Sequence, residues 1–367
     1  MWMRMLITRK LLTVSIQIAG ERMLLLLNSI SHFLVDALCA ATVFGRLGSV
    51  ENLSGLILLY NTLAFSTQCI VGLAADRLRR QAWAGSFSML AVVAGHALPL
   101  PTLMRIILIG LGNSGFHVAG GIMTLKQSEG RAGKLGLFVA PGAVGLTLGT
   151  LLPALGTFFA VLLTLCAAAL PPVSSQTPMR TCENAVSKGM EEGESVLIAM
   201  LLAIVVAVRA VGGSAVTFPW RKGAALTLLM TLCVFAGKSA GGFLCDRIGV
   251  KRAVLLSVLP AAFLIAFGST WILPSLAGQF ALNLTMPVTL WLMYRAMPDA
   301  PGFAFGLAAS ALWPGTLTGQ FIELTGPIRW IFVLLCFLCG LWALLFSEKK
   351  LRTADKEIRL TTRRKRT

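Results

Sequence analysis

Apolar runs of about 20 residues recur along this chain from Leu24 onward, and no other feature constrains its fold as strongly. An α-helix needs about 20 residues to cross roughly 30 Å of hydrocarbon. Of the 367 residues 56% are apolar and only 13% are charged, which is too few charges for a soluble chain. We therefore expect an all-α integral membrane protein with twelve transmembrane helices, at 23–44, 53–75, 82–99, 101–124, 134–152, 155–172, 195–217, 223–245, 252–272, 274–294, 302–321 and 327–347.

The basic residues are concentrated on one side of these predicted helices. With a cytoplasmic N-terminus, the outer loops hold only Arg46, Arg221, Lys222 and Arg329. This is the positive-inside pattern, so we expect a protein of the plasma (inner) membrane with both termini in the cytoplasm. The net charge of +17 then indicates contact with anionic lipid of the bilayer and no nucleic-acid partner, because the cations lie in short loops and in the tail.

One long polar stretch, between Pro172 and Ser195, divides the predicted helices six and six. We expect a cytoplasmic leader (1–22), a first six-helix bundle (23–172), a central cytoplasmic linker (173–194), a second six-helix bundle (195–347) and a basic cytoplasmic tail (348–367). The leader also has features of a signal peptide. Met23 is an alternative first residue, which an intact mass that retains residues 1–22 would exclude.

The chain contains an internal repeat that joins its two halves. The stretch from Gly72 to Arg80, which includes Asp76 and Arg77, returns 170 residues later as the stretch that begins at Gly242 and includes Asp246, Arg247 and Lys251. The same separation of 170 residues joins Asn113 to Asn283 and Gly136 to Gly306. Three matches at one separation indicate a duplication, so we expect two pseudo-symmetric bundles.

These repeated segments resemble the signature loop of the major facilitator superfamily, G-x-x-x-D-R-x-G-R-R, which lies between the second and third helices and has a weaker copy between the eighth and ninth. The resemblance covers essentially the whole chain. Arg79 replaces the loop glycine in the first copy, and Val250 replaces an arginine in the second. The resemblance implies two six-helix bundles with a substrate path between them near the middle of the membrane.

The signature residues also have a physical rationale. Gly72 and Gly242 leave room where a neighbouring helix approaches, and Asp76 and Asp246 can face a helix N-terminus and pair with the arginines. Such contacts would close the cytoplasmic side. The alternative is that these charges only mark an inner loop. The candidate gating residues are Gly72, Asp76, Arg77, Arg80, Gly242, Asp246, Arg247 and Lys251.

Ionisable groups inside a membrane span are costly, so each is expected to line a cavity or to have a partner. Asn28, His32 and Asp36 are spaced four residues apart on one face of the first helix, where His32 and Asp36 could share a proton or a ligand. The resemblance implies that this first-helix acid takes part in proton coupling. The alternative is a buried Asp–His pair without a role in transport.

A second polar stripe, Asn113 and His117 in the fourth helix, is expected to face the first helix across the cavity. Asn61, Gln68, Gln279 and Asn283 would complete the lining, although each amide could equally hold two helices together.

Two cations also fall inside the second half. Lys238 is the repeat partner of Gln68, which suggests an asymmetric pocket for an anionic group; an internal salt bridge to Asp36 is the alternative. Arg209 lies nearer the outer end of its helix, where it could reach the interface or contact the substrate.

No catalytic constellation is apparent. The G-x-G-x-x-G pattern from Gly110 to Gly115 lies within an apolar span with no strand before it, and the C-x-x-C pair of Cys336 and Cys339 has no companion ligands. We therefore expect neither an enzyme nor a cofactor nor a metal site. The sequence favours a monomeric secondary active transporter that moves a small molecule by alternating access, with protons as the coupling ion. A small organic anion is the favoured substrate. The alternatives are an efflux pump for drugs or toxic metabolites and a protein of the same fold that senses a ligand without transport.

Overall fold

The computed structural model describes residues 2–128, 130–177, 190–321 and 324–364, and every regular element in these ranges is helical. The first half contains α1 (Trp2–Ala41), η1 (Thr42–Arg46), α2 (Leu53–Asn61), η2 (Thr62–Ser66), α3 (Gln68–Leu78), α4 (Gln81–Ala97), α5 (Thr102–Gln127), α6 (Gly133–Leu151), η3 (Pro153–Leu155) and α7 (Gly156–Ser175). The second half contains α8 (Glu192–Ser214), α9 (Gly223–Ile248), α10 (Val250–Gly268), α11 (Ile272–Asn283), α12 (Thr285–Ala296), α13 (Pro301–Ser310), α14 (Trp313–Phe321) and α15 (Gly326–Arg364).

Ten stretches of the described chain are helical, long and apolar enough to cross a membrane. The other two of the twelve expected spans are α4, which has 17 residues, and the pair α13 and α14. That pair is interrupted directly before Trp313, which is followed by Pro314 and Gly315; a proline cannot donate a backbone hydrogen bond, so it favours a break in the helix before it. The all-α membrane fold expected from the sequence is confirmed.

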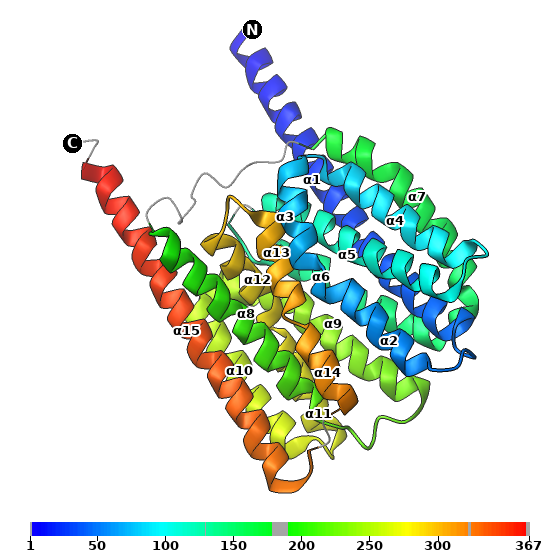
Figure 1. Cartoon of the computed structure of the whole chain (residues 1–367). Helices are drawn as coiled ribbons and strands as arrows, with labels where there is room; N and C mark the ends of the chain where they lie inside the picture. The colour runs from blue at the N-terminus through cyan, green and yellow to red at the C-terminus, as the bar shows by residue number, and fades with distance from the viewer. Residues whose placement is uncertain (1, 129, 178–189, 322–323, 365–367) are drawn as a thin grey trace.

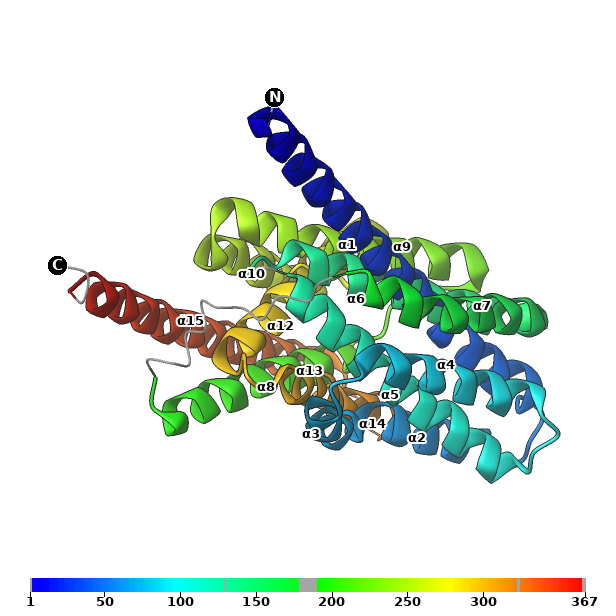
Figure 2. The same cartoon turned by 90° about the horizontal axis from the view of Figure 1, so that it is seen from above.

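The helices form two bundles that lie side by side (Figures 1 and 2). Helices α1 to α7 make one bundle and α8 to α15 make the other, and the bundles meet where α3 packs on α13 and α6 packs on α9. The N-terminal end of α1 and the C-terminal end of α15 extend from the same side of the molecule (Figure 1). Because α1 begins at Trp2 and α15 continues to Arg364, the described parts of the leader and of the tail are helical continuations of the first and last spans.

The two contacts between the bundles repeat each other residue for residue. A Cβ atom added to Gly306 in α13 would lie 2.1 Å from the carbonyl oxygen of Gln68 in α3. At the matched place, a Cβ atom on Gly136 in α6 would lie 2.5 Å from the carbonyl oxygen of Lys238 in α9. Only glycine permits so close an approach of the backbones, and close approach stabilises helix pairs in lipid. The internal repeat of the sequence is therefore a structural pseudo-symmetry.

Within the first bundle, α6 lies directly on α1. Cβ atoms on Gly145 and Gly149 would each lie 2.1 Å from a backbone carbonyl oxygen of α1, those of Phe33 and Ala37 respectively. The face of α6 that carries Gly145 and Gly149 is therefore a helix-packing surface. This packing fixes the position of Asp36, which lies between those two α1 residues.

Candidate functional site

The two bundles enclose a cavity of about 230 Å³. Its polar lining comprises His32 and Asp36 of α1, Gln68 of α3, His117 of α5, Arg209 of α8, Lys238 of α9 and Thr289 of α12. The rest of the lining is mainly apolar and includes Phe65, Met286 and Phe305. Because both bundles contribute side chains, a movement of one bundle against the other would change access to the cavity.

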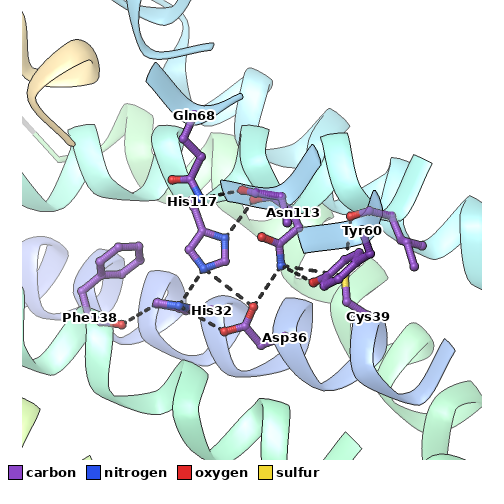
Figure 3. Close-up of polar contacts among 10 residues, drawn as sticks. His32, Asp36, Cys39, Tyr60, Gln68, Asn113, His117 and Phe138 are labelled. Carbon is purple, nitrogen blue, oxygen red and sulfur yellow. Dashed lines mark hydrogen bonds and ion pairs between the residues drawn. The ribbon is translucent and has the colours of Figure 1, made fainter. Parts of the chain in front are cut away.

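On the wall formed by the first bundle, His32, Asp36 and His117 form a compact cluster (Figure 3). The Nε2 atoms of His32 and His117 are 2.9 Å apart. His32 Nε2 lies 3.4 Å from Asp36 Oδ2, and His117 Nε2 lies 3.7 Å from Asp36 Oδ1. The His32–Asp36 proximity that the helical spacing predicts is present, and His117 joins it from the fourth span.

The hydrogen bonds of the two imidazole rings fix which nitrogen carries a hydrogen. His32 Nδ1 lies 2.7 Å from the carbonyl oxygen of Phe138, and His117 Nδ1 lies 2.9 Å from that of Asn113. A carbonyl oxygen only accepts, so each Nδ1 is the donor. In neutral rings both Nε2 atoms then carry lone pairs, and at 2.9 Å these lone pairs face each other. The arrangement therefore calls for a cation shared by the two nitrogens.

A short chain of polar groups orients Asp36. Asn113 Nδ2 donates to Asp36 Oδ1 over 3.0 Å and lies 3.2 Å from the hydroxyl oxygen of Tyr60 in α2 (Figure 3). On the opposite side, a Cβ atom added to Gly142 of α6 would lie 2.4 Å from both Asp36 Oδ2 and His32 Nε2. Neither Tyr60 nor Gly142 can be predicted from the sequence as a site residue, because both act through contacts between distant helices.

The wall formed by the second bundle is basic. Arg209 donates from one terminal nitrogen to Thr285 Oγ1 over 3.1 Å, and its other terminal nitrogen lies 3.3 Å from Met286 Sδ. Among the described residues, neither Arg209 nor Lys238 has a carboxylate within the 4.0 Å of an ion pair. The alternative of a salt bridge from Lys238 to Asp36 is therefore wrong for this conformation.

Gln68 occupies the position that matches Lys238 in the repeat. Its Nε2 donates to the carbonyl oxygen of Ala64 over 2.8 Å. Its Oε1 is buried and has no hydrogen-bond partner among the described residues. An unpaired acceptor costs about 1–3 kcal/mol, so Gln68 offers the cavity a place for a donor group of a ligand.

The other expected lining residues lie elsewhere. Asn28 is fully buried below His32 on α1, and neither of its amide atoms has a partner among the described residues. Asn61, Asn113 and Asn283 do not line the cavity. Asn113 contacts the cavity residue Asp36, and Asn283 donates to the backbone carbonyl oxygen of Gln279 on its own helix. Gln279 lines a second cavity instead. Periodicity placed these amides on a polar face, but the direction of that face depends on how the helix is rotated in its bundle.

The signature aspartates make matched contacts between the bundles, which we call the latches. Asp76 of α3 accepts hydrogen bonds from the backbone N–H groups of Gly302 and Phe303, at 2.7 and 2.9 Å. Asp246 of α9 accepts from those of Ala132 and Gly133, at 2.8 and 2.9 Å. Each carboxylate thus lies at the start of a helix of the other bundle, where the helix dipole favours a negative charge.

The basic residues of the signature do not complete the latches as expected. Among the described residues, neither Asp76 nor Asp246 has an ion pair within 4.0 Å. Arg77, Arg80, Arg247 and Lys251 are exposed. The expected pairing with arginines is therefore wrong, because the backbone N–H groups already satisfy the carboxylates. The gating role of all eight signature residues stays a prediction.

The side of the molecule away from the latches has a larger hollow. This second cavity, which we call the outer cavity because it lies away from the latches, has a volume of about 610 Å³ and is lined by residues that include Thr147, Thr217, Arg221 and Gln279. It shares Ala143 and Leu146 of α6 with the central cavity, so the two adjoin. The larger cavity therefore lies away from the latches and directly beside the central cavity.

Comparison with known proteins places this architecture. No protein-family model and no curated protein matches the chain. The fold matches the E. coli fucose:proton symporter FucP with a TM-score of 0.65 at 11% identity, over 89% of this chain and 99% of that chain. It matches the human organic anion transporter MFSD10 with a TM-score of 0.58 at 16% identity, over 90% and 99%. It matches a bacterial homologue of the iron transporter ferroportin with a TM-score of 0.52 at 14% identity, over 92% of this chain and 99% of that chain.

At these identities the likeness shows the fold. The chain is a multi-pass membrane protein with the major facilitator fold, as the signature loop and the repeat indicated.

Proposed function

We propose that this protein is a secondary active transporter that carries a small organic anion by alternating access. The observation that carries the proposal is the cavity between the bundles, where Arg209 and Lys238 lie without a carboxylate partner among the described residues. A buried cation without a counter-ion is costly in a membrane, so a site with two of them favours an anionic ligand.

The form of the cavity supports alternating access. The latches hold the bundles together on one side, and the outer cavity lies on the other. In this fold, rocking of one bundle against the other would break the latches and close the outer cavity. We further propose that the latch side is cytoplasmic, that both termini lie there and that the protein acts as a monomer in the plasma membrane, as the positive-inside pattern predicts.

The charges argue for an anion against the efflux alternative. The cavity has two fixed cations and one carboxylate, and that carboxylate already accepts a hydrogen bond from Asn113. A cationic drug would meet net repulsion there. The human protein of similar fold is named as an organic anion transporter, which agrees with this choice. The unpaired Gln68 Oε1 further favours an anion that carries a hydroxyl group.

We further propose that transport of the anion is coupled to movement of a cation across the membrane, and that this cation is a proton. The two facing Nε2 atoms of His32 and His117 provide a place for one cation next to Asp36. With protons as the coupling ion, uptake of the anion into proteoliposomes should rise when the outside is made acidic relative to the inside. Dissipating that gradient with a protonophore should abolish the increase; uptake indifferent to the gradient would count against proton coupling.

Uptake by proteoliposomes tests the substrate class. Labelled malate and succinate serve as probes, and Arg209→Gln and Lys238→Gln each remove one cavity cation. A hydrogen bond to a charged group contributes about 1.5–3 kcal/mol, so each substitution should lower uptake by roughly tenfold or more. Lys222→Gln is the matched control, because Lys222 is exposed in an outer loop. If both cavity variants take up the two anions as fast as the unmodified protein does, the proposal is contradicted.

A further inference from the structure

We propose that His32, Asp36 and His117 form a binding site for one divalent first-row transition-metal ion, such as Zn²⁺. The three residues come from α1 and α5, and their potential ligand atoms all lie within 4.8 Å of one another. The spacing of the residues along the chain does not predict a metal site, because the two histidines are 85 residues apart and only the fold brings them together. The site goes beyond the proposed function, since binding does not require transport.

The distances between the ligand atoms suit a single small ion. Zinc binds imidazole nitrogen and carboxylate oxygen at about 2.0–2.2 Å, so two ligands at a tetrahedral angle lie about 3.4 Å apart. The measured separations are 2.9 Å between the two Nε2 atoms, 3.4 Å from His32 Nε2 to Asp36 Oδ2 and 3.7 Å from His117 Nε2 to Asp36 Oδ1. These values bracket the expected separation, so one ion can reach all three residues after small side-chain shifts.

The hydrogen bonds prepare both rings for a metal. Imidazole ligands characteristically donate their second ring N–H to a carbonyl or carboxylate, which fixes the tautomer and leaves the other nitrogen free. His32 does this to the carbonyl oxygen of Phe138 and His117 to that of Asn113. The outcome is two lone pairs aimed at one point, with Asp36 beside them. A metal ion would convert this lone-pair repulsion into two coordinate bonds.

The surroundings leave one side of the cluster open. On the side of His32 the cluster is covered by apolar rings: the ring centroids of Phe116 and Phe138 lie 6.5 and 4.9 Å from that of His32. Gly142 has no side chain to fill the space against Asp36 and His32. All three ligand residues line the central cavity, so a fourth ligand can come from it. Three protein ligands with one open position are typical of metal sites that also bind a small molecule.

The donor set determines which ions are expected. Two imidazoles and one carboxylate suit Zn²⁺, Fe²⁺, Co²⁺ and Ni²⁺, whereas Mg²⁺ and Ca²⁺ prefer oxygen ligands alone. Arg209 and Lys238 face the cluster from the other wall and oppose a bare cation. We therefore expect an anion in the cavity to strengthen metal binding. This last consequence rests on the proposed function, whereas the metal site itself does not.

Titration of the purified full-length protein with Zn²⁺ and Co²⁺ tests the site. We expect one Zn²⁺ per chain by calorimetry, and Co²⁺ should give visible absorption bands of a low-symmetry nitrogen and oxygen site. His117→Asn and Asp36→Asn each remove one ligand and should weaken Zn²⁺ binding by about 100-fold or more, because loss of an outer-shell partner alone costs about 10- to 100-fold. Magnesium should not compete.

His96→Asn is the matched control, because His96 is the remaining histidine of the chain. It does not line the central cavity, and its Nδ1 is hydrogen-bonded to Thr42 Oγ1. This variant should bind Zn²⁺ as the unmodified protein does. Equal binding by the His117→Asn variant, by the Asp36→Asn variant and by the unmodified protein would overturn the inference, as would the absence of Zn²⁺ binding. If Zn²⁺ fails to bind while anion uptake still depends on Lys238, the metal site is wrong and the proposed function stands. If Zn²⁺ binds while anion uptake does not depend on Lys238, the metal site stands and the proposed function is wrong.

Discussion

At the scale of single residues, the two copies of the signature loop show how a backbone position limits the side chain. Arg79 and Gly249 are matched by the repeat, and both have positive φ, 51° and 83°. Arg79 is in the left-handed helical region with ψ of 14°, which other residues tolerate at some cost. Gly249 has ψ of 157°, a region open essentially to glycine alone. The departure from the family pattern at Arg79 is therefore tolerated only because its ψ differs.

Alanine substitution at these two matched positions should consequently have unequal effects. Gly249→Ala should lower stability by about 1–3 kcal/mol, because it forces a side chain into a conformation reserved for glycine. Arg79→Ala should change stability little, since the backbone there already accommodates a side chain. The thermal unfolding midpoint of the detergent-solubilised protein measures both. Equal midpoints for the two variants would contradict this account of the loops.

The amide of Gln68 provides a second test at this scale. If its unpaired Oε1 accepts a hydroxyl hydrogen from the substrate, Gln68→Leu should reduce uptake of malate more than uptake of succinate, which lacks the hydroxyl group. The expected loss of preference is roughly fivefold to tenfold, the equivalent of about 1–1.4 kcal/mol. An unchanged ratio of the two uptake rates would exclude this contact.

At the scale of elements, the latches connect the ends of helices that belong to different bundles. Asp76→Asn should weaken the contact with the N-terminus of α13, because a neutral amide loses the charge-assisted part of two hydrogen bonds. With spin labels at Arg131 and Lys251 in a chain freed of native cysteines, the distance distribution should shift towards longer values. Asp299→Asn is the control, because Asp299 is exposed on the same side. A distribution that Asp76→Asn leaves unchanged would show that the latches do not hold the bundles.

Helix α6 links the packing of the first bundle to its polar cluster. Gly142→Ala would place a methyl group against Asp36 Oδ2 and His32 Nε2, so we expect anion uptake to fall by roughly tenfold or more even though the fold persists. Gly193→Ala is the control, since a Cβ atom there meets no neighbour within 4 Å. Full activity of the Gly142→Ala variant would mean that the cluster has no part in transport.

At the scale of the whole molecule, much of the architecture could be predicted from the sequence. Hydrocarbon-length helices and the repeat at Asp76 and Asp246 indicate the two bundles, because span length and duplication are properties of the chain alone. Helical spacing also predicts the proximity of His32 and Asp36. The rotation of each helix within its bundle depends on contacts between distant segments. For this reason the sequence wrongly predicts that Asn28, Asn61, Gln279 and Asn283 line the central cavity, and it does not predict the roles of Tyr60 and Gly142.

The central claim is that one anion-binding cavity is exposed alternately to the two sides of the membrane. Solute counterflow tests it most directly. Proteoliposomes preloaded with unlabelled malate are diluted into a trace of labelled malate, and a carrier must then accumulate label transiently above its equilibrium level. We predict such an overshoot for the unmodified protein and for Lys222→Gln, and its loss in Lys238→Gln. If malate gives no overshoot with the unmodified protein, or if the overshoot persists in Lys238→Gln, the account is contradicted.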